Sequence, residues 1–278
     1  MLLALGGILA LWAVGPHDYS MLSSLVRSLL FFPTRDVLAP LAAFGADAED
    51  VRFGDHARLH GVFLPPPADS SGLTVVVFHG NGGNLTHRAP LVARMREMFR
   101  AGVFIVDYQG YGQSDGLPSE AATADDARAA IAYLHSRPEV DPGRLVYFGE
   151  SLGGAVAVAL ATEAPPAALM VQSSFTSIAD MTARHYPILR WLLPLANVRY
   201  DSLAAVPHLR VPLLVIHGDA DTLIPSSHAQ QLYDAANEPK RLVLVPGAGH
   251  NDVFVRGGLE LWATMRAFLS ETAGALPK

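Results

Sequence analysis

Short apolar runs alternate with longer amphipathic stretches along most of this chain. Buried strands are predicted where these runs are β-branched and aliphatic, at 73–78, 103–107, 144–149, 168–172, 213–217 and 241–245. Helices are predicted between or after them, at 85–100, 119–136, 152–163, 226–237 and 252–269. A further pair of strands is predicted at 51–53 and 58–64. This alternation favours an α/β fold, a mainly parallel twisted sheet with helices on both faces.

One segment departs from the alternation of strand and helix. Residues 175–210 are apolar and aromatic, but they contain no strand of their own. Connections of this length are usually functional or disordered, and the apolar composition disfavours disorder. We therefore expect a helical cap insertion over the edge of the sheet. The alternative is the crossover helix of an ordinary strand–helix–strand unit.

An apolar segment, residues 1–45, precedes the domain that we expect at 46–278. Residues 2–14 form an uninterrupted run of apolar and small residues, which is shorter than the roughly 20 residues of a membrane-spanning helix. The run has the length of a signal-peptide core, but no Lys or Arg precedes it. Three interpretations stay open: a short or interfacial membrane anchor within residues 2–32, a signal peptide, or a helix packed on the domain. We expect membrane association through this segment, and a cytoplasmic protein is the alternative.

Composition argues against several classes of chemistry. The net charge of −6 disfavours a nucleic-acid partner. The chain has no cysteine, so it has no disulfide, no cysteine nucleophile and no thiolate metal site. Its lysines are Lys240 and Lys278, and neither follows a phosphate-binding glycine loop. We expect neither a metal nor another cofactor.

The sequence GESLG at residues 149–153 has the Gly-x-Ser-x-Gly pattern. A predicted strand precedes it and a small-residue helix follows, so Ser151 falls on a sharp strand-to-helix turn that exposes its hydroxyl group. Side chains two residues to either side would clash in so tight a turn. A serine that only capped the helix would need no flanking glycines. Ser151 is therefore the predicted nucleophile.

A serine nucleophile requires a base and an acid that orients the base. His250 lies in a glycine-rich loop after the last predicted strand and is the predicted base, whereas His79 and His217 are expected to orient loops. Asp221, in the loop after the preceding strand, is the predicted acid. Asp219 is the alternative, although it follows a glycine directly and is expected to close the turn.

An oxyanion hole requires two backbone N–H groups that point at the reacting carbonyl oxygen. The N–H of Leu152, at the start of the helix after the nucleophile, is one predicted donor. The other is the main-chain N–H of Asn81, in the glycine-rich sequence HGNGGN at residues 79–84. Glycines there allow the backbone to approach a substrate closely.

These motifs occur in a recognisable order: HGNGGN, DYQGYGQSDG at 107–116, GESLGG, and HGDADTLIP at 217–225 followed by PGAGH at 246–250. From about residue 50 to its C-terminus the chain resembles the α/β-hydrolase superfamily. It is most similar to the branch of small serine hydrolases with an N-terminal membrane segment, which includes protein depalmitoylases and peptidase-like esterases. In that branch the acid lies four residues before the proline of the HGxxDxxxP motif, which corresponds to Asp221.

The resemblance also has consequences for the pocket. Gln109 stands where the branch usually carries an arginine, and this exchange is expected to alter a salt bridge beside the sheet. Tyr108 and Tyr111 are expected near the substrate pocket, with Tyr111 and, in the cap, Trp191 as the predicted pocket residues.

The resemblance and the residue order predict a serine hydrolase that cleaves carboxylic esters or thioesters of hydrophobic acyl groups through an acyl-enzyme intermediate. Its expected partner is a small-molecule or acylated substrate. An amide- or peptide-cleaving serine hydrolase is one alternative, and a non-catalytic binding module on the same fold is another.

Overall fold

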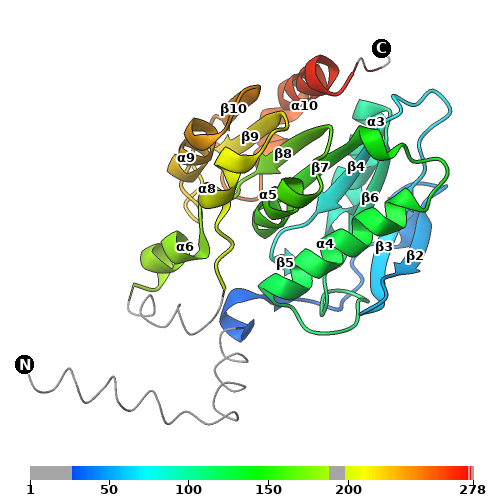
Figure 1. Ribbon diagram of the computed structural model, residues 1–278, viewed down its shortest axis with the longest axis horizontal. Coiled ribbons are helices and arrows are strands. Elements are labelled where there is room, and N and C mark those ends of the chain that lie inside the picture. The colour runs from blue at the N-terminus through cyan, green and yellow to red at the C-terminus, as the bar shows by residue number, and fades with distance from the viewer. Residues whose placement is uncertain (1–26, 188–197, 275, 277–278) are drawn as a thin grey trace, which may run out of the picture.

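The structure, a computed structural model, describes residues 27–187, 198–274 and 276. A twisted sheet runs through the middle of the molecule with helices on both of its faces (Figure 1). Its eight strands have the order β10-β9-β8-β7-β4-β6-β3-β2. They are β2 (Glu49–Phe53), β3 (Leu59–Leu64), β4 (Thr74–Phe78), β6 (Gly102–Val106), β7 (Leu145–Glu150), β8 (Ala168–Gln172), β9 (Leu213–Gly218) and β10 (Lys240–Val245).

Strand direction follows the connections between strands. From β10 to β6 every neighbouring pair is parallel, because a helix returns the chain across one face of the sheet between successive strands. The first strand pair, β2 with β3, is antiparallel, and β3 is also antiparallel to β6. The predicted α/β-hydrolase fold is therefore confirmed.

Side chains on either face of the sheet pack into separate apolar layers. On β4, Val76 and Phe78 join the layer beneath α4 (Glu120–His135), α5 (Leu152–Glu163) and α9 (Ser227–Ala235). Val75 and Val77 join the layer beneath α3 (Ala89–Phe99) and α10 (Val253–Thr272). This two-residue alternation is the geometry of an extended strand, and it explains why the central runs are apolar at every position.

The predicted cap segment is described in part. After β8 the chain forms α6 (Ile178–His185), and it returns to the sheet through the short helix α8 (Ser202–Ala205). Residues 188–197, which include Trp191, lie outside the described residues. The cap as a whole therefore stays a prediction, although α6 lies inside its expected bounds.

The described part of the N-terminal segment packs on the domain. Phe31 is buried in the layer beneath α4 and α5, and Phe44 is buried in the layer beneath α3 and α10. Phe32–Pro33 forms β1, which pairs with β5 (Gly82–Gly83) in a small second sheet. No helix in the described residues, which begin at 27, is long and apolar enough to cross a membrane. The apolar run at 2–14 lies outside that part of the chain, so its role stays a prediction.

Candidate active site

Ser151 lies at a strained turn between β7 and α5. Its backbone φ of 54° and ψ of −113° are unusual for a residue with a side chain. A Cβ on Gly149 would overlap with the Gly153 backbone, and a Cβ on Gly153 would overlap with the carbonyl oxygen of Phe78. The two glycines therefore allow the turn to close and allow α5 to pack directly on the end of β4.

The structure brings together the three side chains predicted as nucleophile, base and acid. His250 Nε2 lies 3.2 Å from Ser151 Oγ, and His250 Nδ1 lies 2.7 Å from Asp221 Oδ2. The three residues follow β7, β10 and β9, whose carboxyl ends meet at one edge of the sheet. Asp219 is not part of this chain of contacts, because its Oδ1 accepts a hydrogen bond from Gly247 N at 2.6 Å and closes the loop.

Asp221 is buried and surrounded by donors. Its Oδ1 accepts hydrogen bonds from the main-chain N–H groups of Leu223 and Ile224, at 2.9 and 2.8 Å. Burial alone would raise the pKa of Asp221, but His217, His250 and the Ile224 N–H hold this pKa well below its usual range. Asp221 is therefore a carboxylate at neutral pH, which is the form that orients an imidazole and stabilises an imidazolium.

The sequence predicted His217 only as a residue that orients a loop. The structure places its Nε2 2.7 Å from the carbonyl oxygen of Ile224 and 3.3 Å from Asp221 Oδ2. His217 therefore holds the loop that carries the acid and also contacts the acid itself. Its position at the end of a buried strand, four residues before Asp221, was the available signal.

Asn81 and Leu152, predicted to supply the oxyanion hole, line the same pocket as Ser151 and His250. Leu152 is the first residue of α5, so its N–H is among those with no partner within the helix. The side chain of Asn81 is occupied by other partners: its Oδ1 accepts a hydrogen bond from Tyr111 Oη at 2.8 Å. The use of both main-chain N–H groups as oxyanion donors stays a prediction.

The pocket has a volume of about 480 Å³, within the usual range for sites that hold small molecules. Much of its wall is apolar, formed by Leu29, Leu30, Phe32, Phe175, Ile178, Met181 and Ile224. Helix α6 supplies part of this wall, so the described portion of the cap segment does border the site. A wall of this composition suits an apolar group better than a charged one.

The charges in this wall are paired. Arg88 Nε and Nη2 donate to the two carboxylate oxygens of Glu150 at 3.0 and 3.1 Å, and Nη1 donates to Gly82 O at 2.9 Å. Both side chains are largely buried, at 15% and 16% exposed. Because the two charges neutralise each other, this pair offers little net charge for a substrate ion.

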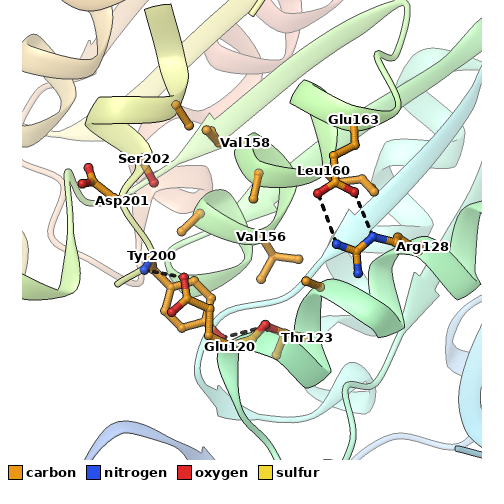
Figure 2. A pocket seen from close by; sticks show the side chains of 14 residues that line it. Glu120, Thr123, Arg128, Val156, Val158, Leu160, Glu163, Tyr200, Asp201 and Ser202 are labelled. Atoms are coloured by element: carbon orange, nitrogen blue, oxygen red, sulfur yellow. Dashed lines mark hydrogen bonds and ion pairs between the residues drawn. The ribbon is translucent and has the colours of Figure 1, made fainter. Parts of the chain in front are cut away.

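A second, smaller crevice lies between α4, α5 and α8, with a volume of about 100 Å³ (Figure 2). Among its polar side chains, Arg128 pairs with Glu163, and Tyr200 Oη lies 2.8 Å from Thr123 Oγ1. Neither Ser151 nor His250 lines it. The pocket that Ser151 and His250 line is therefore the candidate active site.

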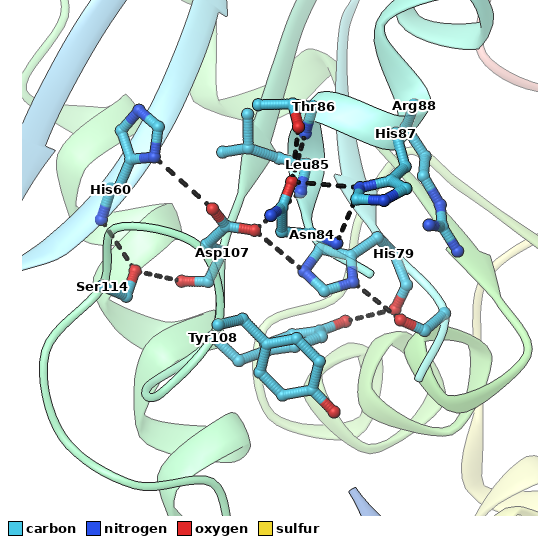
Figure 3. Close-up of polar contacts among 12 residues, drawn as sticks. His60, His79, Asn84, Leu85, Thr86, His87, Arg88, Asp107, Tyr108 and Ser114 are labelled. Atoms are coloured by element: carbon cyan, nitrogen blue, oxygen red, sulfur yellow. Dashed lines mark hydrogen bonds and ion pairs between the residues drawn. The ribbon is translucent and has the colours of Figure 1, made fainter. Parts of the chain in front are cut away.

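A buried polar cluster lies behind the loop that carries Asn81 (Figure 3). Asp107 Oδ1 accepts a hydrogen bond from Leu85 N at 2.7 Å, and the carboxylate lies 3.4 Å from His60 Nδ1 and 3.3 Å from His79 Nε2. Burial raises the pKa of Asp107, but these neighbours together hold it below its ordinary value. His79 Nδ1 in turn lies 2.7 Å from Gly80 O. The cluster therefore fixes both ends of the glycine-rich loop.

The two predicted pocket residues stay predictions. Tyr111 is fully buried and is not among the residues that line the pocket. It lies behind the glycine-rich loop, because its hydroxyl group donates to the side chain of Asn81. Trp191 lies outside the described residues. Gln109 donates from its main-chain N and its side-chain Nε2 to Asp126. Hydrogen bonds from a neutral residue therefore stand where an arginine would form a salt bridge.

A mainly parallel sheet, a serine on a strand-to-helix turn, and a histidine and an aspartate on the neighbouring loops define a serine hydrolase of the α/β-hydrolase fold. Residues 119–275, more than half of the chain, match the model of the prolyl oligopeptidase family. The chain belongs to this family.

Relatives with similar sequences cover most of the chain. An uncharacterised protein of Mycobacterium tuberculosis, Rv2307c, is 41% identical over 252 residues, which cover 89% of this chain and 88% of the relative. The alpha/beta hydrolase domain-containing protein WAV2 of Arabidopsis thaliana is 35% identical over 236 residues, which cover 79% of this chain and 77% of WAV2. Among solved structures, the Pyrococcus furiosus esterase Pf2001 superimposes with a TM-score of 0.72 at 20% identity, covering 87% of this chain and 100% of its own. At that identity the likeness supports the fold.

Proposed function

We propose that this protein hydrolyses carboxylic esters or thioesters of hydrophobic acyl groups, with Ser151 as nucleophile, His250 as base and Asp221 as orienting acid. The observation that carries the proposal is the hydrogen-bonded chain from Asp221 through His250 to Ser151, at the base of a largely apolar pocket of about 480 Å³. The complete chain of contacts also counts against a non-catalytic binding module.

The proposed reaction has two halves. Ser151 Oγ attacks the substrate carbonyl while His250 Nε2 takes the hydroxyl proton, and the oxyanion accepts hydrogen bonds from the N–H groups of Asn81 and Leu152. The tetrahedral intermediate collapses, the alcohol or thiol leaves with the proton from His250, and an acyl-enzyme remains. Water then attacks the acyl-enzyme with His250 as base, which releases the carboxylic acid and restores Ser151.

Peptide or amide hydrolysis is the second candidate, because the matching family is named for oligopeptide cleavage. An amine is a poorer leaving group than an alcohol or a thiol, so it requires full protonation by His250 as the bond breaks. The apolar wall and the neutralised Arg88–Glu150 pair favour acyl substrates over charged peptides. Esters are therefore the first substrates to test.

The experiment compares hydrolysis of p-nitrophenyl esters, from acetyl to palmitoyl, with that of a peptide p-nitroanilide. Ser151→Ala is expected to lower kcat by at least about 10³-fold. Ser136→Ala removes an exposed serine at the end of α4 and is the matched control, expected to keep wild-type activity. An acyl adduct on Ser151, detected by mass spectrometry, would support the two-step route. Ester turnover that survives Ser151→Ala would refute the proposal.

Membrane association is proposed as well, through residues 2–32 together with the rim of the pocket. Exposed apolar side chains lie at this rim, namely Leu29, Phe32, Tyr186 and Leu223. A rim that contacts a bilayer would let an acyl chain enter the pocket with little exposure to water. The full chain is expected to float with phosphatidylcholine vesicles in a density gradient, and Leu29→Ser with Tyr186→Ser to float less. Wild-type protein that stays at the bottom of the gradient would contradict the proposal.

A further inference from the structure

The glycine-rich loop at 80–84, called here the oxyanion loop, is bonded to a segment far from it in sequence. This segment, residues 30–36, is called here the strap. Asn81 Nδ2 donates to Leu30 O at 2.6 Å, and Phe32 N donates to Asn81 Oδ1 at 3.3 Å. The side chain of one loop residue, Asn81, therefore both donates to and accepts from the main chain of the strap.

Backbone pairing continues this attachment along the loop. Strands β1 and β5 form a parallel two-stranded sheet with two residues in each strand, in which Phe32 pairs with Gly82 and Pro33 with Gly83. Thr34 N then donates to Gly83 O at 3.3 Å. The strap therefore runs beside the whole glycine-rich part of the oxyanion loop.

The far end of the oxyanion loop is held in the same way. Asn84 Nδ2 donates to Thr34 O at 3.0 Å and to Asp36 O at 2.8 Å. Gly112 N also donates to Thr34 O, at 2.9 Å, and so ties the strap to the loop after β6. The buried Asp107 cluster supports the oxyanion loop from the other side, through Leu85 N and His79 (Figure 3).

Such support has a physical reason. Glycines lose more conformational freedom on ordering than other residues, and the loop contains Gly80, Gly82 and Gly83, the last with a φ of +86°. An oxyanion donor stabilises the transition state only when its N–H already points at the position the oxyanion will occupy. A loop of this composition needs external contacts to hold one direction.

We propose that the strap is a positioning element of the oxyanion hole, which acts through the side chain of Asn81 to hold the main-chain N–H of the same residue toward the substrate. The inference rests on the proposed function. It makes turnover depend on a part of the N-terminal segment that lies outside the domain expected at 46–278. Asn81 and the main chain of the strap act as positioning groups, distinct from the proton-transfer groups of the triad.

A positioning role predicts a particular kinetic pattern. The oxyanion interaction strengthens in the transition state, so its loss lowers kcat and leaves KM nearly unchanged. Removal of one oxyanion donor typically lowers kcat by about 10²–10³-fold. A misdirected N–H retains part of its effect, so a decrease of about 10- to 100-fold is expected here.

Two variants of the full chain break the attachment from opposite sides. Asn81→Ala removes both side-chain bonds to the strap and keeps the main-chain N–H. Phe32→Pro removes the N–H that donates to Asn81 Oδ1 and leaves the oxyanion loop unaltered in sequence. Phe32→Ala is its matched control, because it removes the same pocket-lining side chain and keeps that N–H.

We expect kcat for a p-nitrophenyl ester to fall about 10- to 100-fold in Asn81→Ala, and in Phe32→Pro relative to Phe32→Ala, with KM within about threefold in each comparison. Circular dichroism and thermal melting check that each variant is folded. If Asn81→Ala and Phe32→Pro keep kcat within about twofold of their references, the strap does not position the oxyanion hole.

Amide hydrogen exchange separates a failure of this inference from a failure of the proposed function. Peptides that cover residues 80–84 are expected to exchange faster in Asn81→Ala and Phe32→Pro than in wild type and Phe32→Ala. This readout needs no substrate, so it applies even if the wild type hydrolyses no ester. Unchanged exchange at 80–84 in both variants would overturn the inference, and absent wild-type turnover with faster exchange would overturn only the proposed reaction.

Discussion

Asp126 on α4 is a carboxyl group that the fold buries beside a neutral partner. It is 1% exposed, and Gln109 donates to it from main-chain N at 2.7 Å and from side-chain Nε2 at 2.8 Å. Burial raises the pKa of Asp126 from its ordinary value of 3.8 to about 6, and these hydrogen bonds offset part of the increase. We predict that Asp126→Asn stabilises the protein at neutral pH.

The sign and size of the effect follow from linkage between protonation and folding. Below pH 3.8 the carboxyl group is protonated in both the folded and the unfolded chain, so its ionisation does not affect stability. Between about pH 3.8 and pH 6 the unfolded chain is ionised while the folded chain keeps the proton, so stability falls as the pH rises, and above about 6 the loss is complete. The difference in pKa corresponds to about 3 kcal/mol at about 1.4 kcal/mol per pKa unit.

Asparagine keeps the shape of the side chain and removes the ionisation. It accepts from Gln109 N through its oxygen, and its amide donates to the Gln109 side chain after that amide rotates. The free energy of unfolding of Asp126→Asn should therefore exceed that of the wild type by about 1–3 kcal/mol at pH 8 and be nearly equal at pH 4.

The assay is urea-induced unfolding of both proteins between pH 4 and pH 8, followed by circular dichroism. The difference between the two proteins isolates Asp126 from the other carboxyl groups. Asp125→Asn is the matched control, because Asp125 is the preceding residue on the same helix and forms an exposed pair with Arg128; its effect should stay below about 1 kcal/mol. A difference between Asp126→Asn and wild type that does not change with pH would refute the reasoning.

Two further variants test the turn and the acid. Gly153→Ala is expected to lower the free energy of unfolding by about 2 kcal/mol or more and to abolish ester hydrolysis, because the added Cβ overlaps with Phe78 O. An active variant with wild-type stability would contradict the packing described for α5. Asp221→Asn is expected to lower kcat by about 10⁴-fold, because an amide no longer holds His250 in the required tautomer. Asp219→Asn keeps the triad and is expected to retain kcat within about tenfold, so equal losses in the two aspartate variants would argue against Asp221 as the acid.

Most of the sheet and the three triad side chains could be predicted because their signals are local. The central strands are nearly uninterrupted apolar runs, and each triad residue lies within a few residues of the end of such a run, on a turn rich in glycine or aspartate. Parallel strands bring their carboxyl ends to one edge of the sheet. Local patterns and this single rule of topology were therefore sufficient to place Ser151, Asp221 and His250 together.

The contacts that were missed depend on pairs of residues far apart in the chain. Asn81 and Leu30 are separated by 51 positions, and Asp107 and Leu85 by 22. The strands β1 and β5 have two residues each, too few to show any periodicity. Tyr111 was expected near the pocket from the family resemblance, and sequence does not show which face of the loop its side chain takes. In the structure its buried hydroxyl group donates to Asn81 Oδ1.

These missed contacts bear on how a glycine-rich loop remains ordered beside an apolar pocket. The apolar side chains of the wall cannot form hydrogen bonds with the loop, so the polar groups of the loop must find partners among main-chain groups and polar side chains. They find them in the Asp107 cluster on one side and in the strap on the other. Leu30 and Phe32, which belong to the strap, also line the pocket, so one segment bounds the acyl group and holds the loop. A substitution at Leu30 or Phe32 that changes acyl-chain preference should therefore also change kcat whenever it moves the strap backbone. Helix α6 forms none of the described hydrogen bonds to Asn81, so substitutions there should change acyl-chain preference alone.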